Sequence, residues 1–243
     1  MHSLSIYDMD KTVTGKASWT PWLFHYARTE APARLLLTPL MALPLLGYVL
    51  GTHDRKALKQ ATQHILMGRR VPREKVARAA ESFAAGFGAR QELAGALAAI
   101  AADRAEGREL WLATASCRYF VEALARRWGF DHVVATDNHW VGDRLTPEIH
   151  GENCYEMGKL RKILADLSAR PDTVKFSSDH ISDLPVFDWA DEPVAANPHE
   201  PLRQLALARG WAVFDWAKAS GPAAVQARPH RHRVPAGNPS PAG

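Results

Sequence analysis

Two carboxylates stand two residues apart near the start of the chain, directly after a short apolar run. The run Leu4–Tyr7 leads into Asp8 and Asp10. Thr12 and Thr14 follow at the same spacing. A short apolar run of this kind is typical of a buried strand. Two acidic residues at its end either form a solvated turn or hold a cation and take part in chemistry.

Further polar residues lie at the ends of other predicted elements. Thr114 closes one predicted strand, and Asp179 and Asp183 follow another. Lys159 opens the helix that precedes this last strand. Each has an ordinary explanation by itself, since an aspartate can cap a turn or a helix and a lysine is usually solvated. Because sites in parallel α/β sheets form at the carboxyl ends of strands, their joint placement indicates a site.

These residue types fit phosphoryl transfer to an aspartate. A carboxylate such as Asp8 can attack phosphorus, and the resulting aspartyl-phosphate divides one difficult hydrolysis into two easier steps. Two anions must approach each other, so a hard cation is needed, and Mg²⁺ prefers oxygen ligands such as those of Asp8 and Asp179. Lys159 and the Thr114 hydroxyl would stabilise the phosphoryl oxygens. Asp10 would protonate the leaving alcohol and then activate water.

The elements that must position these residues fall into two groups. Up to about residue 107, the sequence after the first strand shows helical patterns around 18–28, in an apolar run, and over 54–67, 73–86 and 90–105. Strands and helices then alternate, with an extended hairpin that turns at Gly142 and Asp143. The alternation is typical of a parallel α/β sheet. The helical stretch is too long for a simple crossover, so we interpret it as an inserted cap.

Three regions follow from this division. We expect a core of residues 1–15 and 88–218, and a helical cap over 16–87. Residues 219–243 are rich in Pro, Gly and Ala without periodicity, and we expect them to be disordered.

The composition is that of an ordinary globular protein, with 47% hydrophobic and 23% charged residues in 243. Part of the net charge of +4 comes from "RPHRHR" near the C-terminus, so no nucleic-acid partner is inferred. Cys117 and Cys154 make no disulfide framework, which indicates a reducing compartment. Structure that is expected to begin at residue 3 leaves no room for a signal peptide, and we expect a cytoplasmic protein.

The apolar run Leu35–Gly51 complicates this expectation. It is 17 residues long without a charge, whereas a membrane-spanning helix needs about 20. Pro39 and Pro44 would also break or kink a helix. A buried helical hairpin is the first hypothesis. The second is peripheral membrane contact through residues 35–51 at the inner face of the membrane; a true span is the least favoured. The basic residues that flank the run are Arg28, Arg34, Arg55, Lys56 and Lys59.

The polar residues together resemble the four motifs of the haloacid dehalogenase-like hydrolases. The motifs are "DMDKT" at 8–12, "LAT" ending at Thr114, "GK" at 158–159 and "SDHISD" at 178–183. More narrowly, the chain resembles the subgroup related to phosphoserine phosphatase, whose helical cap is inserted soon after the first motif. The resemblance covers most of residues 3–216 and is weakest in the cap. It implies an α/β fold, a Rossmann-like three-layer parallel sheet with an inserted α-helical cap.

The resemblance also implies a role for each residue. Asp8 is the nucleophile and Asp10 the general acid and base. Thr114 and Lys159 bind the substrate phosphate. The metal set for Mg²⁺ is Asp8, Asp10 through its backbone carbonyl, Asp179, and Asp183 in support of the metal's water shell.

Two residues depart from the family pattern. Lys11 stands where a small residue is common, and His180 follows Asp179 where Ser or Gly is usual. A turn residue is the first interpretation of His180, and a residue that reaches the site is the second.

The substrate is less well indicated. Phosphoserine phosphatases use a cap glutamate shortly after the first motif, but no carboxylate occurs between Val13 and Thr29. The apolar run is similar to that of phosphatases acting on phosphatidylglycerophosphate. We expect a Mg²⁺-dependent phosphomonoesterase that acts on a small-molecule or lipid-headgroup phosphate monoester. The alternatives are an amino-acid phosphatase of the phosphoserine type and a phosphotransferase with the same intermediate; an idle binding module on this fold is disfavoured.

Overall fold

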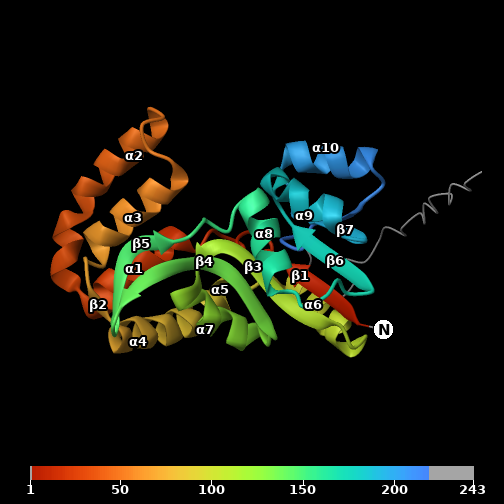
Figure 1. Ribbon diagram of the computed structural model, residues 1–243, viewed down its shortest axis with the longest axis horizontal. Coiled ribbons are helices and arrows are strands. Elements are labelled where there is room, and N and C mark those ends of the chain that lie inside the picture. The colour runs from red at the N-terminus through yellow and green to blue at the C-terminus, as the bar shows by residue number, and fades with distance from the viewer. Residues whose placement is uncertain (1, 219–243) are drawn as a thin grey trace, which may run out of the picture.

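An eight-stranded sheet runs through residues 2–218, the part of the chain that the computed structural model describes (Figure 1). The tail predicted over 219–243 lies outside the described residues. The strand order is β2-β5-β4-β3-β1-β6-β7-β8. The strands are β1 (Ser3–Tyr7), β2 (Val71–Pro72), β3 (Glu109–Cys117), β4 (His132–Val141), β5 (Arg144–His150), β6 (Thr173–Ser178), β7 (Glu192–Ala196) and β8 (Ala212–Phe214). Six strands, in the order β4-β3-β1-β6-β7-β8, pair in parallel. At one edge β5 pairs antiparallel with β4, and β2 pairs antiparallel with β5.

Helices cover both faces of the parallel strands, which confirms the predicted three-layer α/β fold. On one face lie α8 (Met157–Asp166), α9 (Leu184–Trp189) and α10 (Glu200–Ala208). On the other lie α6 (Ala94–Ala105) and α7 (Arg118–Trp128). Strand β1 shows why two layers form, because alternate side chains point to opposite faces. Leu4 and Ile6 pack with the first layer, and Tyr7 packs with the second.

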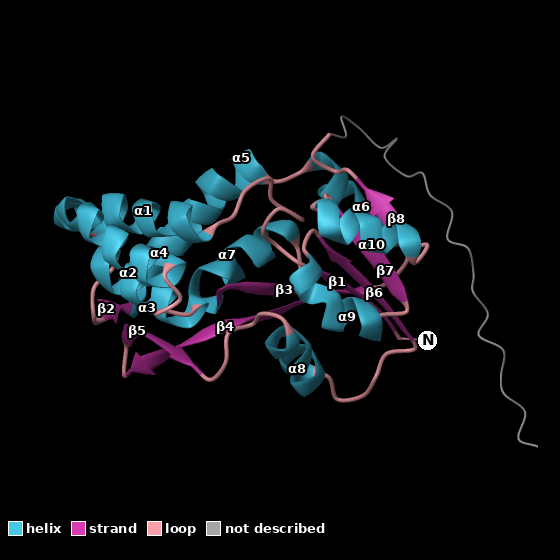
Figure 2. Cartoon of the chain, turned by 90° about the horizontal axis from the view of Figure 1, so that it is seen from above, coloured by secondary structure: helices cyan, strands magenta, loops and turns pink. Residues whose placement is uncertain are grey.

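The chain between β1 and α6 forms a helical segment at one end of the sheet (Figure 2). It contains α1 (Trp19–Glu30), the 3₁₀ helix η1 (Pro32–Met41), α2 (Ala42–Val49), α3 (Arg55–Leu66), α4 (Arg73–Phe83), the π-helical turn η2 (Ala84–Gly88) and α5 (Ala89–Gln91). The predicted helices are therefore present. Strand β2, which pairs with β5, was not predicted, and neither was α9. Both are too short to show a periodic pattern.

Of two predicted features in the central strands, one is present and the other differs. The hairpin predicted around Gly142 and Asp143 is present as β4 and β5. The strand expected to end at Thr114 continues instead to Cys117, with an irregular register after Ala113. This irregularity brings more backbone to the carboxyl edge of the sheet than a regular strand end would.

The hypothesis that the apolar run is a buried hairpin is wrong. Its residues form η1 and α2, which project at the outer edge of the molecule (Figure 1). η1, which lies wholly within the described residues, has no buried side chain. In α2 only Pro44 and Gly47 are buried. η1 contacts α1 and α3, and α2 contacts α3. Most leucines of η1 and α2 nevertheless face solvent.

An aromatic cluster joins the helical segment to α7. The Trp22 ring is fully buried and stacks on Phe120 with centroids 4.8 Å apart. Phe83 meets Trp22 edge-on at 5.5 Å. Aromatic pairs in these arrangements add to the free energy gained from burial.

We therefore expect Trp22→Ala to lower the free energy of unfolding by about 3–5 kcal/mol, because it leaves a cavity between α1, α4 and α7. Urea denaturation of both proteins measures this difference. Trp189→Ala, at a half-buried position on α9, is the control and should have a smaller effect. A loss below about 1 kcal/mol for Trp22→Ala would contradict this role for the cluster.

Candidate active site

Three neighbouring parallel strands end at the same edge of the sheet. β1 lies between β3 and β6, with Tyr7 opposite both Leu112 and Ser177. The backbone N–H of Asp8 donates to the carbonyl of Ser177 over 2.9 Å, so the β1–β6 ladder holds Asp8 as well. The register therefore brings the carboxyl ends of all three strands together.

The predicted residues at these strand ends are all buried. Asp8 follows β1, Thr114 lies near the end of β3, and Asp179 follows β6. Thr114 Oγ1 accepts a hydrogen bond from the backbone N–H of Ser116 over 3.1 Å. Because Asp8 and Asp179 are close enough for the charge of one to affect the other, the structure gathers residues 171 positions apart along the chain.

Lys159 connects two of the carboxylates. Its Nζ donates to Oδ1 of Asp8 over 2.9 Å and to Oδ2 of Asp183 over 2.7 Å. Ser178 Oγ also donates to Oδ2 of Asp183, over 2.6 Å. Lys159 is only 2% exposed. The structure thus gives Asp183 a direct partner in Lys159, a contact that the sequence analysis did not foresee.

Lys159 can reach the strand ends because α8 begins very close to the loop before it. A Cβ on Gly158 would lie 2.5 Å from the carbonyl oxygen of Asn153, nearer than real Cβ contacts allow. Glycine at 158 permits this approach. The first turn of α8 therefore delivers Lys159 to the edge of the sheet.

Asp10 lies on the side of the edge that faces the helical segment. The backbone N–H of Ser18 donates to Asp10 Oδ1 over 2.9 Å, and Ser116 Oγ donates to Oδ2 over 3.2 Å. The two serine hydroxyls lie 3.0 Å apart. Burial raises the pKa of Asp10, and these hydrogen bonds oppose the rise only in part. Sequence reasoning missed both serines, since neither belongs to a distinctive motif.

Lys11, which stands where a small residue is common in the family pattern, lies in the loop after Asp10. Lys11 has φ +62°, a left-handed conformation that L side chains rarely adopt. Asn197, at the end of β7, donates through Nδ2 to the carbonyl of Lys11 over 2.8 Å. The strained turn is therefore tied to the core. The ammonium of Lys11 also lowers the pKa of Asp179 in opposition to burial, so this lysine adds positive charge to the site.

The charges at the edge leave an excess of negative groups. Burial raises the pKa of Asp8 to about 8; Lys159 opposes this, while Asp183 and Asp179 reinforce it. Burial and then Asp183 raise the pKa of Asp179 to about 6. Burial by itself would lower the pKa of Lys159, but Asp183 and Asp8 hold it well above its usual range. The three carboxylates share one buried lysine, so a cation is favoured beside them.

The donor set at this edge fits Mg²⁺. Among residues 2–218, no three His, Cys, Asp or Glu side chains lie so placed that they hold a metal by themselves. Mg²⁺ does not need such a cage, because it keeps several waters and binds one or two carboxylates together with substrate phosphate. Asp8 and Asp179 offer two carboxylates, and the Asp10 carbonyl is a third oxygen from the same turn. Asp183 is engaged by Lys159 and Ser178 instead.

His180 has a clear structural role. Its Nδ1 accepts from the backbone N–H of Ser182 over 3.1 Å and so caps the 3₁₀ turn η3 (Ile181–Asp183). The ring stacks on His199 with centroids 4.2 Å apart. Burial and then His199 lower the pKa of His180. These contacts agree with the interpretation of His180 as a turn residue.

Lys59 reaches the same edge from α3, and the sequence analysis missed this. Its Nζ donates to the carbonyl oxygen of Ala115 over 2.5 Å and to Oδ1 of Asn153 over 2.8 Å. Ala115 lies between Thr114 and Ser116, so Lys59 holds the backbone that carries both. Burial lowers the pKa of Lys59, and Asp10 is among the groups that oppose this. In sequence Lys59 follows the apolar run, but its ammonium reaches the strand ends.

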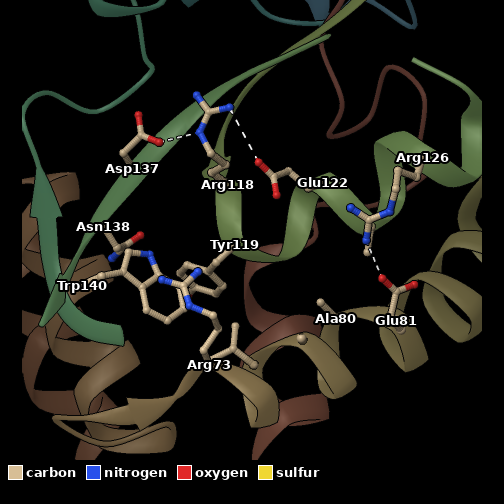
Figure 3. A pocket seen from close by; sticks show the side chains of 13 residues that line it. Arg73, Ala80, Glu81, Arg118, Tyr119, Glu122, Arg126, Asp137, Asn138 and Trp140 are labelled. Carbon is tan, nitrogen blue, oxygen red and sulfur yellow. Dashed lines mark hydrogen bonds and ion pairs between the residues drawn. The ribbon is translucent and has the colours of Figure 1, made fainter. Parts of the chain in front are cut away.

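A separate hollow of about 500 Å³ lies between α4, α7 and β4 (Figure 3). The arginines that line it are already engaged. Arg118 donates to Asp137 over 2.5 Å, and Arg126 pairs with Glu81. Arg73 lies over the ring of Trp140, 4.0 Å from its centroid. None of the lining residues comes from the predicted site, so we place the chemistry at the strand ends.

Known proteins resemble the chain in sequence and in fold. The family model for haloacid dehalogenase-like hydrolases matches residues 6–188. A probable phosphatase of Mycobacterium tuberculosis is 31% identical over 122 residues, which cover 49% of this chain and 42% of that protein. Phosphoserine phosphatase SerB1 of Mycobacterium tuberculosis is 29% identical over 113 residues, covering 45% of this chain and 37% of that protein. The chain therefore spans less than half the length of these two relatives.

Among solved structures, a Bordetella pertussis protein of unknown function matches with a TM-score of 0.78. It is 25% identical in sequence, and the match covers 89% of this chain and 99% of that one. The similarity thus extends through the helical segment as well as the sheet.

The raised pKa of Asp8 predicts how stability depends on pH without a metal. The folded protein holds a proton on Asp8 between its usual pKa near 4 and about 8, so ionisation of Asp8 destabilises the fold as the pH rises through this window. Asp8→Asn removes this contribution. In EDTA, the variant should gain stability relative to the wild type from pH 5.5 to pH 8, measured by urea denaturation.

In saturating Mg²⁺ at pH 8, the wild type should instead gain stability relative to Asp8→Asn, because a bound cation stabilises the ionised carboxylate and not the amide. The difference between the two proteins isolates Asp8 from histidines that titrate in the same range. A variant that loses stability relative to the wild type as the pH rises in EDTA would contradict the proposed charge balance.

Proposed function

This chain belongs to the haloacid dehalogenase-like hydrolase family, and from that membership we propose that it is a Mg²⁺-dependent phosphomonoesterase. The proposal depends on one observation above all. Lys159 is buried between Asp8 and Asp183 at the edge where β1, β3 and β6 end. A fixed ammonium beside a buried carboxylate supports attack of that carboxylate on a phosphate ester.

In the first step, the Asp8 carboxylate attacks phosphorus. Lys159 holds one of its oxygens, which leaves the other free to form the new O–P bond. Lys159 and the Thr114 hydroxyl then stabilise the phosphoryl oxygens, and the ester O–P bond breaks. Burial raises the pKa of Asp10, which favours its protonated form, and Asp10 gives its proton to the leaving alcohol.

In the second step, Asp10 is ionised and takes a proton from water, which attacks the aspartyl-phosphate on Asp8. Phosphate leaves and both carboxylates return to their first state. Ser18 and Ser116 hold the two oxygens of Asp10 in place for both transfers. When bound by Asp8, Asp179 and the Asp10 carbonyl, Mg²⁺ would neutralise the charge of the incoming phosphate.

Residues 16–87 would act as the cap that selects the substrate. The absence of a carboxylate between Val13 and Thr29 disfavours an amino-acid phosphate, although SerB1 carries the name of a phosphoserine phosphatase. The exposed leucines of η1 and α2 favour a lipid-headgroup monoester over a small soluble metabolite. We place the enzyme in the cytoplasm, with peripheral contact to the membrane.

Asp8→Asn should abolish phosphate release from an aryl phosphate in Mg²⁺, because an amide cannot form the acyl-phosphate. Asp10→Asn should lower turnover roughly 10²- to 10⁴-fold, since it loses proton transfer in both steps. Acid quenching with ³²P-labelled substrate should trap labelled protein in Asp10→Asn and not in Asp8→Asn. Unchanged phosphate release by Asp8→Asn would refute the phosphatase assignment.

Lys59 should act as a positioning residue, because it holds the Ala115 carbonyl. Ala115 lies between Thr114, which would bind phosphate, and Ser116, which holds Asp10. We expect Lys59→Met to lower kcat roughly 10- to 100-fold and to leave KM within about twofold. The limb of its pH–rate profile that Asp10 sets should also move to higher pH, since the loss of a nearby cation raises the pKa of Asp10. Lys59→Arg should recover part of the rate.

The matched control is Lys56→Met. Lys56 lies on the same helix and donates to the carbonyl of Gly151 over 2.9 Å, a contact with the core away from Ala115. This variant should keep kcat and the pH profile of the wild type. Equal effects of the two variants would mean that α3 acts only by packing.

A further inference from the structure

The segment formed by η1 and α2, here called the apolar arm (residues 32–50), exposes an unusual set of side chains. Seven large apolar residues are between 48% and 83% exposed: Leu36, Leu40, Leu43, Leu45, Leu46, Val49 and Leu50. Four more exposed large hydrophobic residues are scattered over the rest of residues 2–218. The arm therefore concentrates apolar surface in one projecting element.

Such a surface is not stable in water by itself. A helix that is apolar on all sides is normally buried in a protein core or in a membrane. Contiguous exposed apolar patches on soluble domains mark interaction sites. In α2 only the side with Pro44 and Gly47 meets the protein, so apolar side chains face outward around most of the helix. The arm is thus built to be covered by something else.

Charge favours a lipid bilayer as the partner. No acidic residue occurs between residues 31 and 53, so nothing in the arm repels anionic headgroups. Arg28 before the arm and Arg55 after it are exposed. Lys56 and Lys59, which flank the run in sequence, are engaged by the carbonyls of Gly151 and Ala115, so electrostatic attraction is weaker than the sequence implies. Apolar insertion must therefore supply most of the binding free energy.

The shape of the arm favours contact with the interface rather than a span. By length and composition, Pro32–Val49 could cross a bilayer. The segment divides instead into the 3₁₀ helix η1, with Pro39 inside it, and the short helix α2. Neither part is long enough to span about 30 Å of hydrocarbon. Both can lie in the plane of the interface with their leucines inserted.

An apolar pocket of about 440 Å³ lies beneath the arm. The arm contributes Met41 and Leu45 to its lining, and α1 contributes Trp19. Trp19 directly follows Ser18, whose backbone N–H holds Asp10. A bilayer on the arm would therefore lie next to a pocket whose lining includes the neighbour of an Asp10-binding residue.

We propose that the apolar arm docks the protein on a lipid bilayer. The leucines insert among the acyl chains at the interface, and Arg28 and Arg55 meet the headgroups. Docking itself does not require the proposed function. Its benefit to the enzyme rests on that function, because a docked cap presents the site to phosphate esters held in the membrane.

The test is vesicle flotation with the full chain. Wild-type protein should float with phosphatidylcholine vesicles, more strongly when they contain phosphatidylglycerol, and should stay bound in 0.5 M salt. Leu43→Glu combined with Leu46→Glu should weaken binding at least tenfold. Leu36→Glu combined with Val49→Glu, a second pair that lines no pocket, should do the same. The control pair, Leu164→Glu with Leu207→Glu, places charges at exposed leucines on α8 and α10 and should bind as the wild type does.

Two outcomes would overturn the proposal. One is the absence of flotation on both vesicle types at low salt. The other is a concentration-dependent dimer in light scattering that the arm variants dissociate, which would assign the arm to a second copy of the chain. Hydrolysis of a soluble aryl phosphate is measured in parallel. It should be equal in all variants, so a failure of docking and a failure of the phosphatase assignment remain separate results.

Discussion

The structure of the site depends on the burial of one ammonium among carboxylates. Taking Lys159, Asp8 and Asp183 out of water carries a large desolvation penalty, which only close pairing offsets. The lysine contacts two of the acids directly, and Asp179 adds a third negative group with no comparable partner in the described residues. An edge with this charge balance holds its carboxylates ready for a cation and for an anionic substrate. The rest of the core serves to keep these groups in place.

Sheet topology performs most of that work. Because β1 lies between β3 and β6, the carboxyl ends of these three strands meet, and a polar site residue lies at or near each end. Helix α8 then delivers Lys159 from above the sheet, through a close approach that Gly158 permits. Asn197 ties the strained turn at Lys11 to the end of β7. The strands and helix α8 thus supply most of the supports, and the loop after Asp10 is held by Asn197 just beyond β7.

The helical segment has two faces with different chemistry. Helix α3 turns Lys59 toward the strand ends, where it holds the backbone between Thr114 and Ser116. The arm turns its leucines outward, away from the core. A segment that contacts the strand ends on one side and exposes leucines on the other can link a binding surface to positioning of the proton donor. A purely structural insertion would bury its leucines and leave its lysines in water.

Local features of the chain were enough to predict the α/β class, because the alternation of strands and helices can be read before packing is known. The six site residues were proposed from strand ends and short polar motifs. The partner that each residue meets depends on the folded arrangement. Asp183 is bound by Lys159, and Asp10 is held by Ser18 and Ser116. The same holds for burial. The apolar run, for which a buried hairpin was the first hypothesis, exposes most of its leucines. Lys59, which follows that run, is half-buried and donates to the Ala115 carbonyl. Composition sets how much a side chain gains from leaving water, but the arrangement of neighbouring elements decides whether there is anything to cover it.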